Sequence, residues 1–437
     1  MATITDLLAA QNIDVDLQIN PPELVASLWK GAGAATRITT LNNHTPLIVK
    51  VIKSAAALTS VQLESYRVEH NFYTQGFAQT CQDAGLVVPT CCICDEYKTE
   101  DLISTSTSKK KKKKRKIKNS KIGKSKNHTD CPVLGNQPRF YSVLSDLTTT
   151  HPTQVEDCNL LQAKAALSWM ANFHAIFTNK VTATSPPTSS SSTSSSTSSS
   201  TSLQRDHSGN LRGLWRQGTF WTLTRNKDKH MLMCKTYDAE IKSRLCKEHD
   251  ASVLTPSVLQ LGQRLNIAAK VIHQRLQPEY SRNKICWFTL LHGDLKGANI
   301  KFTQDNLNAG VYDFQWAGGG LNCQDIAYFM ISAVHPSALI HEEELLQEYF
   351  IQYKSFLSLK KFKKKMPSSQ LMTFSEFHML YEIALLDFMR WLIGYGLWGG
   401  PAESWSLQKA DEILSRIDRG CVVSEEIYEK GFEKGFA

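Results

Sequence analysis

Two kinds of hydrophobic pattern divide the chain near residue 147. Before that point, short β-branched or apolar runs predict a strand–turn–strand over residues 28–38, a buried strand over residues 47–52 (LIVKVI), and strands within residues 86–94 and 140–144. Apolar residues at helical spacing predict one helix over residues 61–76, with Gly76 as its cap. The sequence therefore predicts a twisted antiparallel sheet with one helix, forming a small lobe over residues 1–147.

Residues 148–437 follow a mostly helical pattern. The apolar pattern of residues 159–179 predicts a strong amphipathic helix, and helical periodicity continues from residue 211 to the end. We therefore expect a larger, mainly helical second lobe and an α+β, two-lobed fold. The longest apolar region, residues 384–398, is interrupted by Asp387 and Arg390, so we expect no membrane-spanning helix.

Two segments of low complexity interrupt these patterns. Residues 101–130 contain a Lys-rich run, in which twelve Lys and Arg residues fall between Lys109 and Lys126 without an acidic residue. Residues 184–208 contain fifteen consecutive Ser or Thr residues. Neither segment can bury enough apolar area to fold, so we expect two disordered insertions. The run from Lys109 to Lys118 is compatible with a nuclear-localisation signal or a polyanion contact, but an insertion without a partner is equally expected.

Composition limits the classes of function. The formal net charge is +9, but without those twelve basic residues 38 basic residues face 41 acidic ones, a balance of −3. The rest of the chain therefore has no nucleic-acid-binding character. Eleven cysteines without paired CxxC spacing, and an N-terminus without a basic segment before an apolar stretch, predict reduced thiols in the cytoplasm and no secretory signal.

The segment from residue 289 to residue 328 carries the candidate chemistry. An apolar strand leads to His292, Gly293 and Asp294 within HGDLKGAN; Asn299 follows five residues after Asp294, and a second apolar strand leads to Asp313. Phosphoryl transfer from ATP needs a carboxylate for the acceptor hydroxyl, oxygen ligands for Mg²⁺ and a cation for the phosphates. This order and spacing match the catalytic loop and metal-binding aspartate of kinases.

We therefore expect Asp294 to act as catalytic base, and Asn299 and Asp313 to bind Mg²⁺. Lys296, two residues after the base, is placed to reach the γ-phosphate of ATP. His292 is expected to support the loop through hydrogen bonds rather than to take part in the chemistry.

A kinase of this kind also needs a lysine that contacts the ATP phosphates and a glutamate that pairs with it. Lys50 lies within a buried strand, where an unpaired ammonium group is costly, and Glu69 on the following helix is the expected partner. Lys53 and Glu64 are the alternatives. Gly31 and Gly33 are candidates for a close backbone approach to the phosphates, although the segment lacks a full GxGxxG pattern.

The segment VLSDL joins the two predicted lobes. We expect the backbone from Leu144 to Asp146 to contact adenine. Four residues of the second lobe, Trp215, Trp221, Asp387 and Trp398, are candidates for the acceptor pocket, although structural roles are the more common reading of such residues.

These segments resemble the aminoglycoside phosphotransferase and choline kinase superfamily, and within it the ecdysteroid-kinase-like branch. The resemblance rests on HGDLKGANI and VYDFQWAGGGLNCQDIAYF, with support from LIVKVI, SYRVEHNFY and ALSWMANFHAIF. It implies a protein-kinase-like fold, ATP and Mg²⁺ as cofactors, and a hydroxylated small molecule as acceptor. Carried over, it implies the same base, metal ligands and Lys50–Glu69 pair. The incomplete glycine loop and Ser145 in VLSDL depart from the family pattern.

Two other classes of function remain at this stage. A protein kinase is disfavoured because the loop is HGD rather than HRD and no APE motif follows Asp313. A pseudokinase or scaffold, binding an acidic partner through the Lys-rich segment, is disfavoured because the base, both metal ligands and the Lys–Glu pair are all present. The sequence indicates neither the identity of the acceptor nor the oligomeric state.

Overall fold

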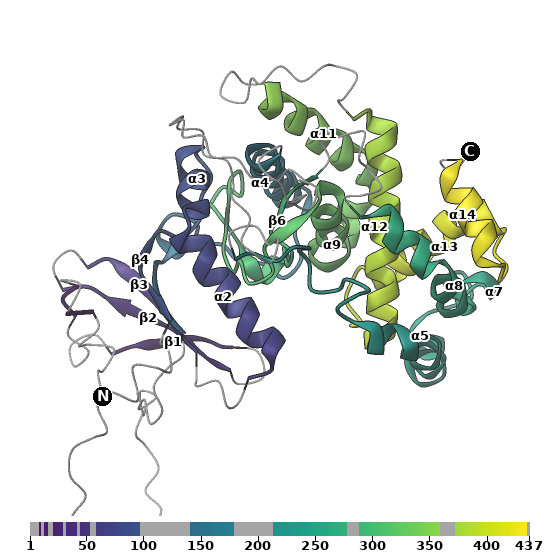
Figure 1. Cartoon of the computed structure of the whole chain (residues 1–437), viewed down its shortest axis with the longest axis horizontal. Coiled ribbons are helices and arrows are strands. Elements are labelled where there is room, and N and C mark those ends of the chain that lie inside the picture. Colours follow the sequence, from purple (N-terminus) through teal and green to yellow (C-terminus); the bar gives the residue numbers. More distant parts are fainter. Residues whose placement is uncertain are drawn as a thin grey trace, which may run out of the picture. The chain divides into compact units, whose positions relative to one another are not determined.

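The structure is a computed structural model that describes residues 8–9, 13–15, 21–28, 32–41, 44–52, 58–96, 140–178, 213–277, 288–358 and 372–434. The chain forms two compact units (Figure 1). Unit 1 comprises Met1–Thr74 and Thr90–Asp146, and unit 2 comprises Gln75–Pro89 and Leu147–Ala437. Both predicted insertions, and the candidates Gly31 and Lys53, lie outside the described residues.

Unit 1 contains an antiparallel sheet of five strands in the order β1-β2-β3-β5-β4. The strands are β1 (Glu23–Ser27), β2 (Gly33–Thr39), β3 (Pro46–Ile52), β4 (Cys91–Glu96) and β5 (Phe140–Ser145). The predicted strand over residues 47–52 is the central strand β3, which pairs with β2 on one side and β5 on the other. Its continuous β-branched run is consistent with that central position.

The residues of β3 alternate between the two faces of the sheet. Leu47 and Val49 pack in a core with Ile38 and Val143, whereas Ile52 packs on the opposite face. Helix α2 (Ser60–Thr74) packs against β4 and β5. Because successive side chains of a strand point to opposite faces, Lys50 shares the face of Ile52.

Residues 75–89 belong to unit 2, although the sequence pattern placed them in the small lobe. Helix α3 (Phe77–Asp83) packs on α4 (Leu160–Phe177). Val87 forms a bridge with Gly310, and Trp169 Nε1 donates a hydrogen bond to the Val87 carbonyl at 3.2 Å. Through these contacts residues 75–89 pack on unit 2. The second segment of unit 2 begins at Leu147, next to the boundary predicted from the sequence.

Two short pairs of strands in unit 2 carry the candidate catalytic segment. Strand β6 (Phe288–Leu291) pairs with β9 (Gly318–Leu321), and β7 (Ile300–Phe302) pairs with β8 (Ala309–Val311), both antiparallel. Helix α4 packs on β6 and β8. Its N-cap is Asn159, whose side chain forms a capping box with Gln162.

The rest of unit 2 is helical. Its further helices are α5 (Lys227–Glu240), α6 (Cys246–Glu248), α7 (Pro256–Leu259), α8 (Leu261–Arg275), α9 (Asn322–Ala333), α10 (Pro336–Leu339), α11 (Glu342–Ser358), α12 (Phe374–Tyr395), α13 (Glu403–Asp418) and α14 (Glu425–Glu433), with short helical turns at Leu147–Thr149, Ile241–Leu245 and Gly297–Asn299. The long helix α12 packs against α5, α8, α9 and α13 (Figure 1).

None of the helices among the described residues is long and apolar enough to span a bilayer. The predicted α+β class, with a small antiparallel sheet and a larger helical part, is confirmed.

Candidate active site

The turn after β6 is fixed by hydrogen bonds to Asp325 on α9. The carboxylate oxygens of Asp325 accept hydrogen bonds from the backbone amides of His292 and Gly293, at 2.7 and 2.9 Å. His174 on α4 donates to the same carboxylate at 3.2 Å. All of these groups are buried, so the turn has a fixed backbone even though it is not part of a strand.

Gly293 is required at its position for two reasons. Its φ of +81° lies in the left-handed region. A Cβ atom there would lie 2.2 Å from the carbonyl oxygen of Trp316. The tight turn that presents the next residue, Asp294, therefore depends on the glycine of the HGD motif.

His292 supports the loop as a neutral ring. Its Nε2 lies 3.0 Å from the carbonyl oxygen of Tyr312, which can only accept, and its Nδ1 accepts from the amide of Asp294 at 3.2 Å. These partners assign the proton to Nε2. Burial lowers the pKa of His292, and the nearby carboxylates, Asp325 first among them, only partly offset this effect. The sequence-based expectation that His292 acts through hydrogen bonds agrees with this geometry.

Asp294 is buried and hydrogen-bonded through both carboxylate oxygens. Oδ2 accepts from Lys296 Nζ at 3.0 Å and from Asn299 Nδ2 at 3.2 Å, and Oδ1 accepts from the Tyr328 hydroxyl at 2.7 Å. Burial disfavours the charge on Lys296, but the Asp294 carboxylate outweighs it, and the pKa of Lys296 is raised. Lys296 therefore remains charged beside the predicted base.

The β7–β8 hairpin brings the backbone at Asn299 next to the residue that precedes Asp313. Ile300 pairs with Val311, and the amide of Tyr312 donates to the carbonyl of Asn299 at 3.2 Å, one residue before Asp313. Asp313 has a left-handed φ of +70°, which is uncommon outside glycine and is tolerated best by Asn and Asp. Such a backbone conformation is typical of functional sites.

The side chain of Asn299 is oriented by its amide nitrogen. Nδ2 donates to the Asp294 backbone carbonyl at 2.7 Å and to Asp294 Oδ2. Within the described segments, no hydrogen bond reaches Oδ1 of Asn299. Asn299 therefore presents a carbonyl oxygen, and Asp313 a carboxylate, which are the oxygen ligands that Mg²⁺ prefers.

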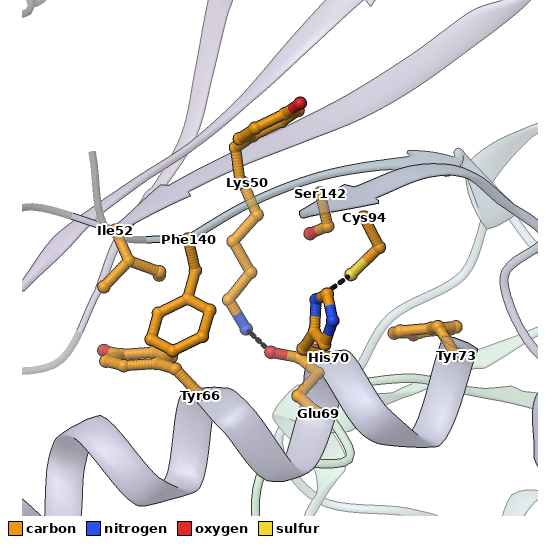
Figure 2. Close-up of a pocket in the computed structure, with 10 residues that line it drawn as sticks. Lys50, Ile52, Tyr66, Glu69, His70, Tyr73, Cys94, Phe140 and Ser142 are labelled. Atoms are coloured by element: carbon orange, nitrogen blue, oxygen red, sulfur yellow. Dashed lines mark hydrogen bonds and ion pairs between the residues drawn. The ribbon is translucent and has the colours of Figure 1, made fainter. Parts of the chain in front are cut away.

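In unit 1, Lys50 Nζ lies 2.5 Å from Glu69 Oε2, and both side chains are less than a tenth exposed (Figure 2). The alternative partner, Glu64, instead pairs with Arg67 at 2.6 Å on α2, where both side chains are partly exposed. The structure thus brings together the pair that was favoured from the sequence. Burial of both charges means that each depends on the other for compensation.

A small pocket surrounds this ion pair (Figure 2). Besides Lys50 and Glu69, it is lined by Tyr66, His70 and Cys94 among others. Lys50 Nζ lies 5.9 Å from the centre of the Tyr66 ring, and Cys94 Sγ lies 3.1 Å from His70 Nδ1. The sequence pattern indicated neither contact.

The remaining candidates of unit 1 have partners within the sheet. A Cβ atom on Gly33 would lie 2.0 Å from the carbonyl oxygen of Val51 on the neighbouring strand, so strand packing already requires glycine there. Leu144 pairs with Ile48 within the β3–β5 ladder. The buried Asp146 carboxylate accepts from Arg37 Nε at 2.5 Å.

Two backbone amides in the predicted adenine-binding segment also have partners. The amide of Ser145 donates to the Thr90 carbonyl at 2.9 Å, and the amide of Asp146 donates to the Pro46 carbonyl at 3.3 Å. Neither amide is therefore available to adenine in this structure.

The four acceptor candidates lie in different environments. Trp221 is buried and stacks on Tyr328, and the buried Asp387 accepts from Arg390 at 2.8 Å, so both have structural partners. Trp215 is half-buried and stacks on a second tryptophan, whereas Trp398 is 45% exposed.

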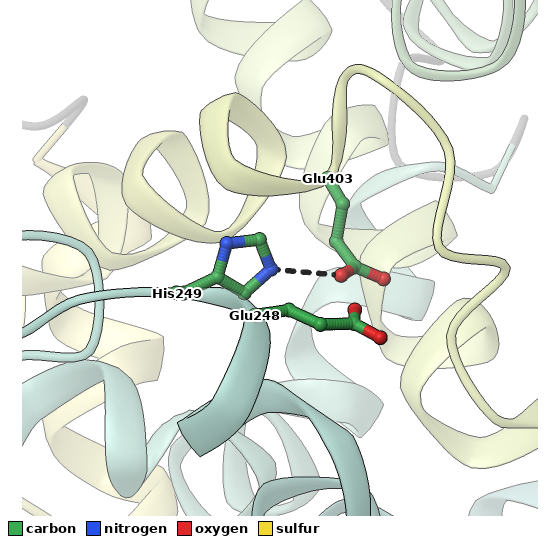
Figure 3. A group of neighbouring side chains, drawn as sticks. All are labelled: Glu248, His249 and Glu403. Carbon is green, nitrogen blue, oxygen red and sulfur yellow. Dashed lines mark hydrogen bonds and ion pairs between the residues drawn. The ribbon is translucent and has the colours of Figure 1, made fainter.

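A second group of acidic and imidazole side chains, Glu248, His249 and Glu403, lies where the end of α6 meets the start of α13 (Figure 3). Its negative charge is partly neutralised by Arg244, whose guanidinium contacts both oxygens of Glu403 at 2.8 Å and Glu248 at 2.6 Å. The Glu403 carboxylate also raises the pKa of Arg244. Because a guanidinium already occupies the place of a cation, we interpret this group as a structural clamp.

Several residues of the site were not indicated by the sequence pattern. Asp325 and Tyr328 lie within QDIAY, a segment that carried the family resemblance, but no role followed from their spacing. His174 lies on the predicted helix α4. Their partners are distant in the chain, so only the folded arrangement identifies them.

Comparison with known proteins gives the family. The sequence pattern of the ecdysteroid kinase-like family matches residues 108–362, which is more than half of the chain. No curated protein matches the sequence.

Several solved structures are similar to this chain at low sequence identity. A choline kinase from Cryptosporidium parvum Iowa II has a TM-score of 0.44 and 12% identity, with 98% of this chain and 96% of that chain covered. An aminoglycoside phosphotransferase from Alicyclobacillus acidocaldarius has a TM-score of 0.41 and 11% identity, with the same coverage. A Plasmodium vivax ethanolamine kinase has a TM-score of 0.39 and 7% identity, with 90% of this chain and 83% of that chain covered. From the match over residues 108–362, this chain belongs to the ecdysteroid kinase-like family.

Proposed function

We propose that this protein transfers the γ-phosphoryl group of ATP to a hydroxyl group of a small molecule. One observation carries the proposal: a buried carboxylate, Asp294, is held beside Lys296 and Asn299, and the carbonyl of Asn299 accepts from the amide of Tyr312, the residue before Asp313. This set supplies a base, a cation and two oxygen ligands, which are the groups that phosphoryl transfer needs.

In this proposal Asp294 accepts the proton of the acceptor hydroxyl. The acceptor oxygen forms a bond to the γ-phosphorus, and the bond from the γ-phosphorus to the bridging oxygen of ADP breaks. Lys296 lies 3.0 Å from the base and carries a raised pKa, so it stays protonated and is placed to stabilise charge on the transferred group.

Asn299 and Asp313 would hold Mg²⁺. The fit is chemical: the amide oxygen of Asn299 accepts no hydrogen bond from the described residues, and Asp313 offers a carboxylate two residues beyond the paired strand β8. When bound, Mg²⁺ supplies positive charge to the phosphate oxygens of ATP.

Lys50 is the proposed contact for the phosphates nearer the nucleoside, with Glu69 holding its side chain in place. Among the described residues of β3, Lys50 is the only lysine, and its charge is retained in a buried position by the 2.5 Å contact with Glu69. A buried ion pair contributes little net stability, which favours a functional reason for its presence.

The test is a phosphorylation screen with purified protein, ATP and Mg²⁺. Choline, aminoglycosides, sterols and sugars all offer a hydroxyl group and form the first panel of acceptors, and product is detected by mass. We expect transfer to at least one class of acceptor and loss of transfer in Asp294→Asn, with Mg·ATP binding retained.

The other outcomes identify the alternatives. Transfer to proteins rather than to small molecules would indicate a protein kinase. Mg²⁺-independent or absent nucleotide binding would indicate a pseudokinase or scaffold. Equal transfer by the wild-type protein and Asp294→Asn would reject the proposed base.

A further inference from the structure

Tyr328 occupies a position on α9 where its ring and its hydroxyl have different surroundings. The ring is buried and stacks on Trp221 with centroids 4.7 Å apart and planes at 22°. Phe220 and Phe388 contact it edge-on, at 5.6 and 4.9 Å. The hydroxyl donates to Asp294 Oδ1 at 2.7 Å. The aromatic contacts therefore fix the ring, and the ring fixes the direction of the hydrogen bond.

The two oxygens of Asp294 are held from different elements. Lys296 and Asn299, which contact Oδ2, belong to the catalytic loop itself. Tyr328 contacts Oδ1 from a helix, and no other donor to Oδ1 is present in the described part of the chain. Without Tyr328, all side-chain donors to the carboxylate would lie on one side of it, and rotation about its bond to Cβ would be less restricted.

The direction of this hydrogen bond follows from the chemistry of the pair. A carboxylate only accepts, so the tyrosine must donate. Burial, together with the nearby Asp294 carboxylate, raises the pKa of Tyr328 well above its ordinary value. The hydroxyl thus keeps its proton under ordinary assay conditions and is not a competing base.

We propose that Tyr328 is a positioning residue of the phosphotransfer reaction: its hydroxyl fixes the orientation of the Asp294 carboxylate, so that a lone pair of this group faces the acceptor hydroxyl. The inference rests on the function proposed above. The acceptor proton moves to Asp294, and Tyr328 keeps its own proton throughout. Holding the reacting groups in a fixed orientation lowers the activation barrier, because the entropy of bringing them together is lost before the reaction step.

The variant Tyr328→Phe tests this role, because it keeps the ring and its stack on Trp221 and removes only the hydroxyl. We expect kcat to fall by roughly 10- to 100-fold, as for a small misplacement of a catalytic group. KM for ATP should change less than about twofold, because Asp294 contributes orientation of the acceptor rather than nucleotide binding. An unchanged kcat in Tyr328→Phe would overturn the positioning role.

A kinetic double-mutant cycle separates positioning from a structural effect. If Tyr328 acts through Asp294, then Tyr328→Phe added to Asp294→Asn should lower the residual kcat by less than about twofold. A further loss as large as that in the wild-type background would show that Tyr328 acts independently, and would overturn the inference. Urea unfolding of each variant shows whether the ring change itself disturbs the fold.

Tyr428 provides the matched control. Its ring is also buried, and its hydroxyl donates to a carboxylate, Asp418 Oδ2, at 2.5 Å. Tyr428→Phe therefore makes the same chemical change away from the catalytic loop, and should leave kcat unchanged. If Tyr428→Phe lowers kcat as much as Tyr328→Phe does, loss of a buried hydroxyl is a general structural effect and the positioning role is rejected.

The same experiments distinguish failure of this inference from failure of the proposed function. If Asp294→Asn is as active as the wild-type protein, the phosphotransfer mechanism through Asp294 is wrong, and the role of Tyr328 is wrong with it. If Asp294→Asn strongly lowers kcat while Tyr328→Phe is fully active, only the role of Tyr328 is wrong.

Discussion

Asp325 holds His292 through a buried hydrogen bond, in which the backbone amide of His292 donates to Asp325 Oδ2 at 2.7 Å. The other oxygen of Asp325 accepts from Gly293, so the change Asp325→Ala leaves two buried amides without a carboxylate partner. A buried donor without a partner costs about 1–3 kcal/mol. We expect Asp325→Ala to lower the free energy of unfolding by roughly 3 kcal/mol, measured by urea denaturation.

The control for this variant is Asp238→Ala, which removes an exposed carboxylate on α5. Surface substitutions of this kind usually change stability by less than about 0.5 kcal/mol. A similar loss in both variants would contradict a special role for Asp325 in holding the turn.

The proximity of the candidate site residues could be predicted from the sequence because their spacing is local. Asp294 and Asn299 are five residues apart, and Asp313 follows the hairpin that begins after Asn299, so spacing alone predicts that they lie near each other. The partner of Lys50 was also predictable, because the helix with Glu69 follows the strand directly and a buried ammonium needs a nearby carboxylate.

Other features depend on contacts between distant parts of the chain. The hydrogen bond between Tyr328 and Asp294 joins residues 34 positions apart, and no sequence pattern specifies it. Helix α4 was predicted to be amphipathic, but it is buried on almost all sides, because α3, α11 and the strands β6 and β8 cover different faces. Such covering is a tertiary property, which helical periodicity does not contain.

The Lys50–Glu69 pair gives a prediction about stability. Removal of one partner leaves a buried charge, so Glu69→Leu should lower the free energy of unfolding by about 3 kcal/mol. The double variant Lys50→Met with Glu69→Leu removes both charges and should lose clearly less than the sum of the two single variants. Urea denaturation of the four proteins measures this difference.

The Glu64–Arg67 pair on the same helix is the control for that cycle. Both of its side chains are about one-third exposed, so solvent screens the interaction, and the pair should contribute less than about 1 kcal/mol. Strictly additive effects of the Lys50 and Glu69 variants would contradict their coupling in the buried state.

Asp313 gives a prediction about metal dependence. Asp313→Asn keeps a residue that tolerates the left-handed backbone at φ +70°, and removes the negative charge. We expect the affinity for Mg·ATP to fall at least about tenfold, or ~1.4 kcal/mol, with little change for ATP in EDTA. Calorimetric titrations with and without Mg²⁺ measure both values.

Asp305 serves as the reference position for this experiment. It is an exposed carboxylate in the turn of the same β7–β8 hairpin, where it accepts from the amide of Leu307 at 3.0 Å. Asp305→Asn keeps an oxygen that can accept this bond, and should leave the affinity for Mg·ATP unchanged. Equal affinities of Asp313→Asn and the wild-type protein would remove Asp313 from the metal site.

Buried tyrosines predict a loss of stability at alkaline pH. Burial raises the pKa of Tyr328, Tyr349 and Tyr381 well above the ordinary value of 10, and neighbouring groups add to this effect. On unfolding they return to that ordinary value, so above about pH 10 the folded state binds protons that the unfolded state has released. The free energy of unfolding therefore stays independent of these groups below pH 10 and falls as the pH rises above it, by roughly 1.4 kcal/mol per pH unit for each such tyrosine.

Urea denaturation between about pH 9 and about pH 11, with tyrosinate absorbance of the folded protein recorded in parallel, measures this slope. The variant Tyr381→Phe removes one of the buried hydroxyls with a raised pKa and should make the alkaline slope shallower. Tyr395→Phe changes a tyrosine that is 49% exposed, and the slope should remain as steep as in the wild-type protein. If the folded protein instead ionises Tyr328, Tyr349 and Tyr381 near pH 10 without loss of stability, these hydroxyls do not have the buried environments from which their raised pKa values follow.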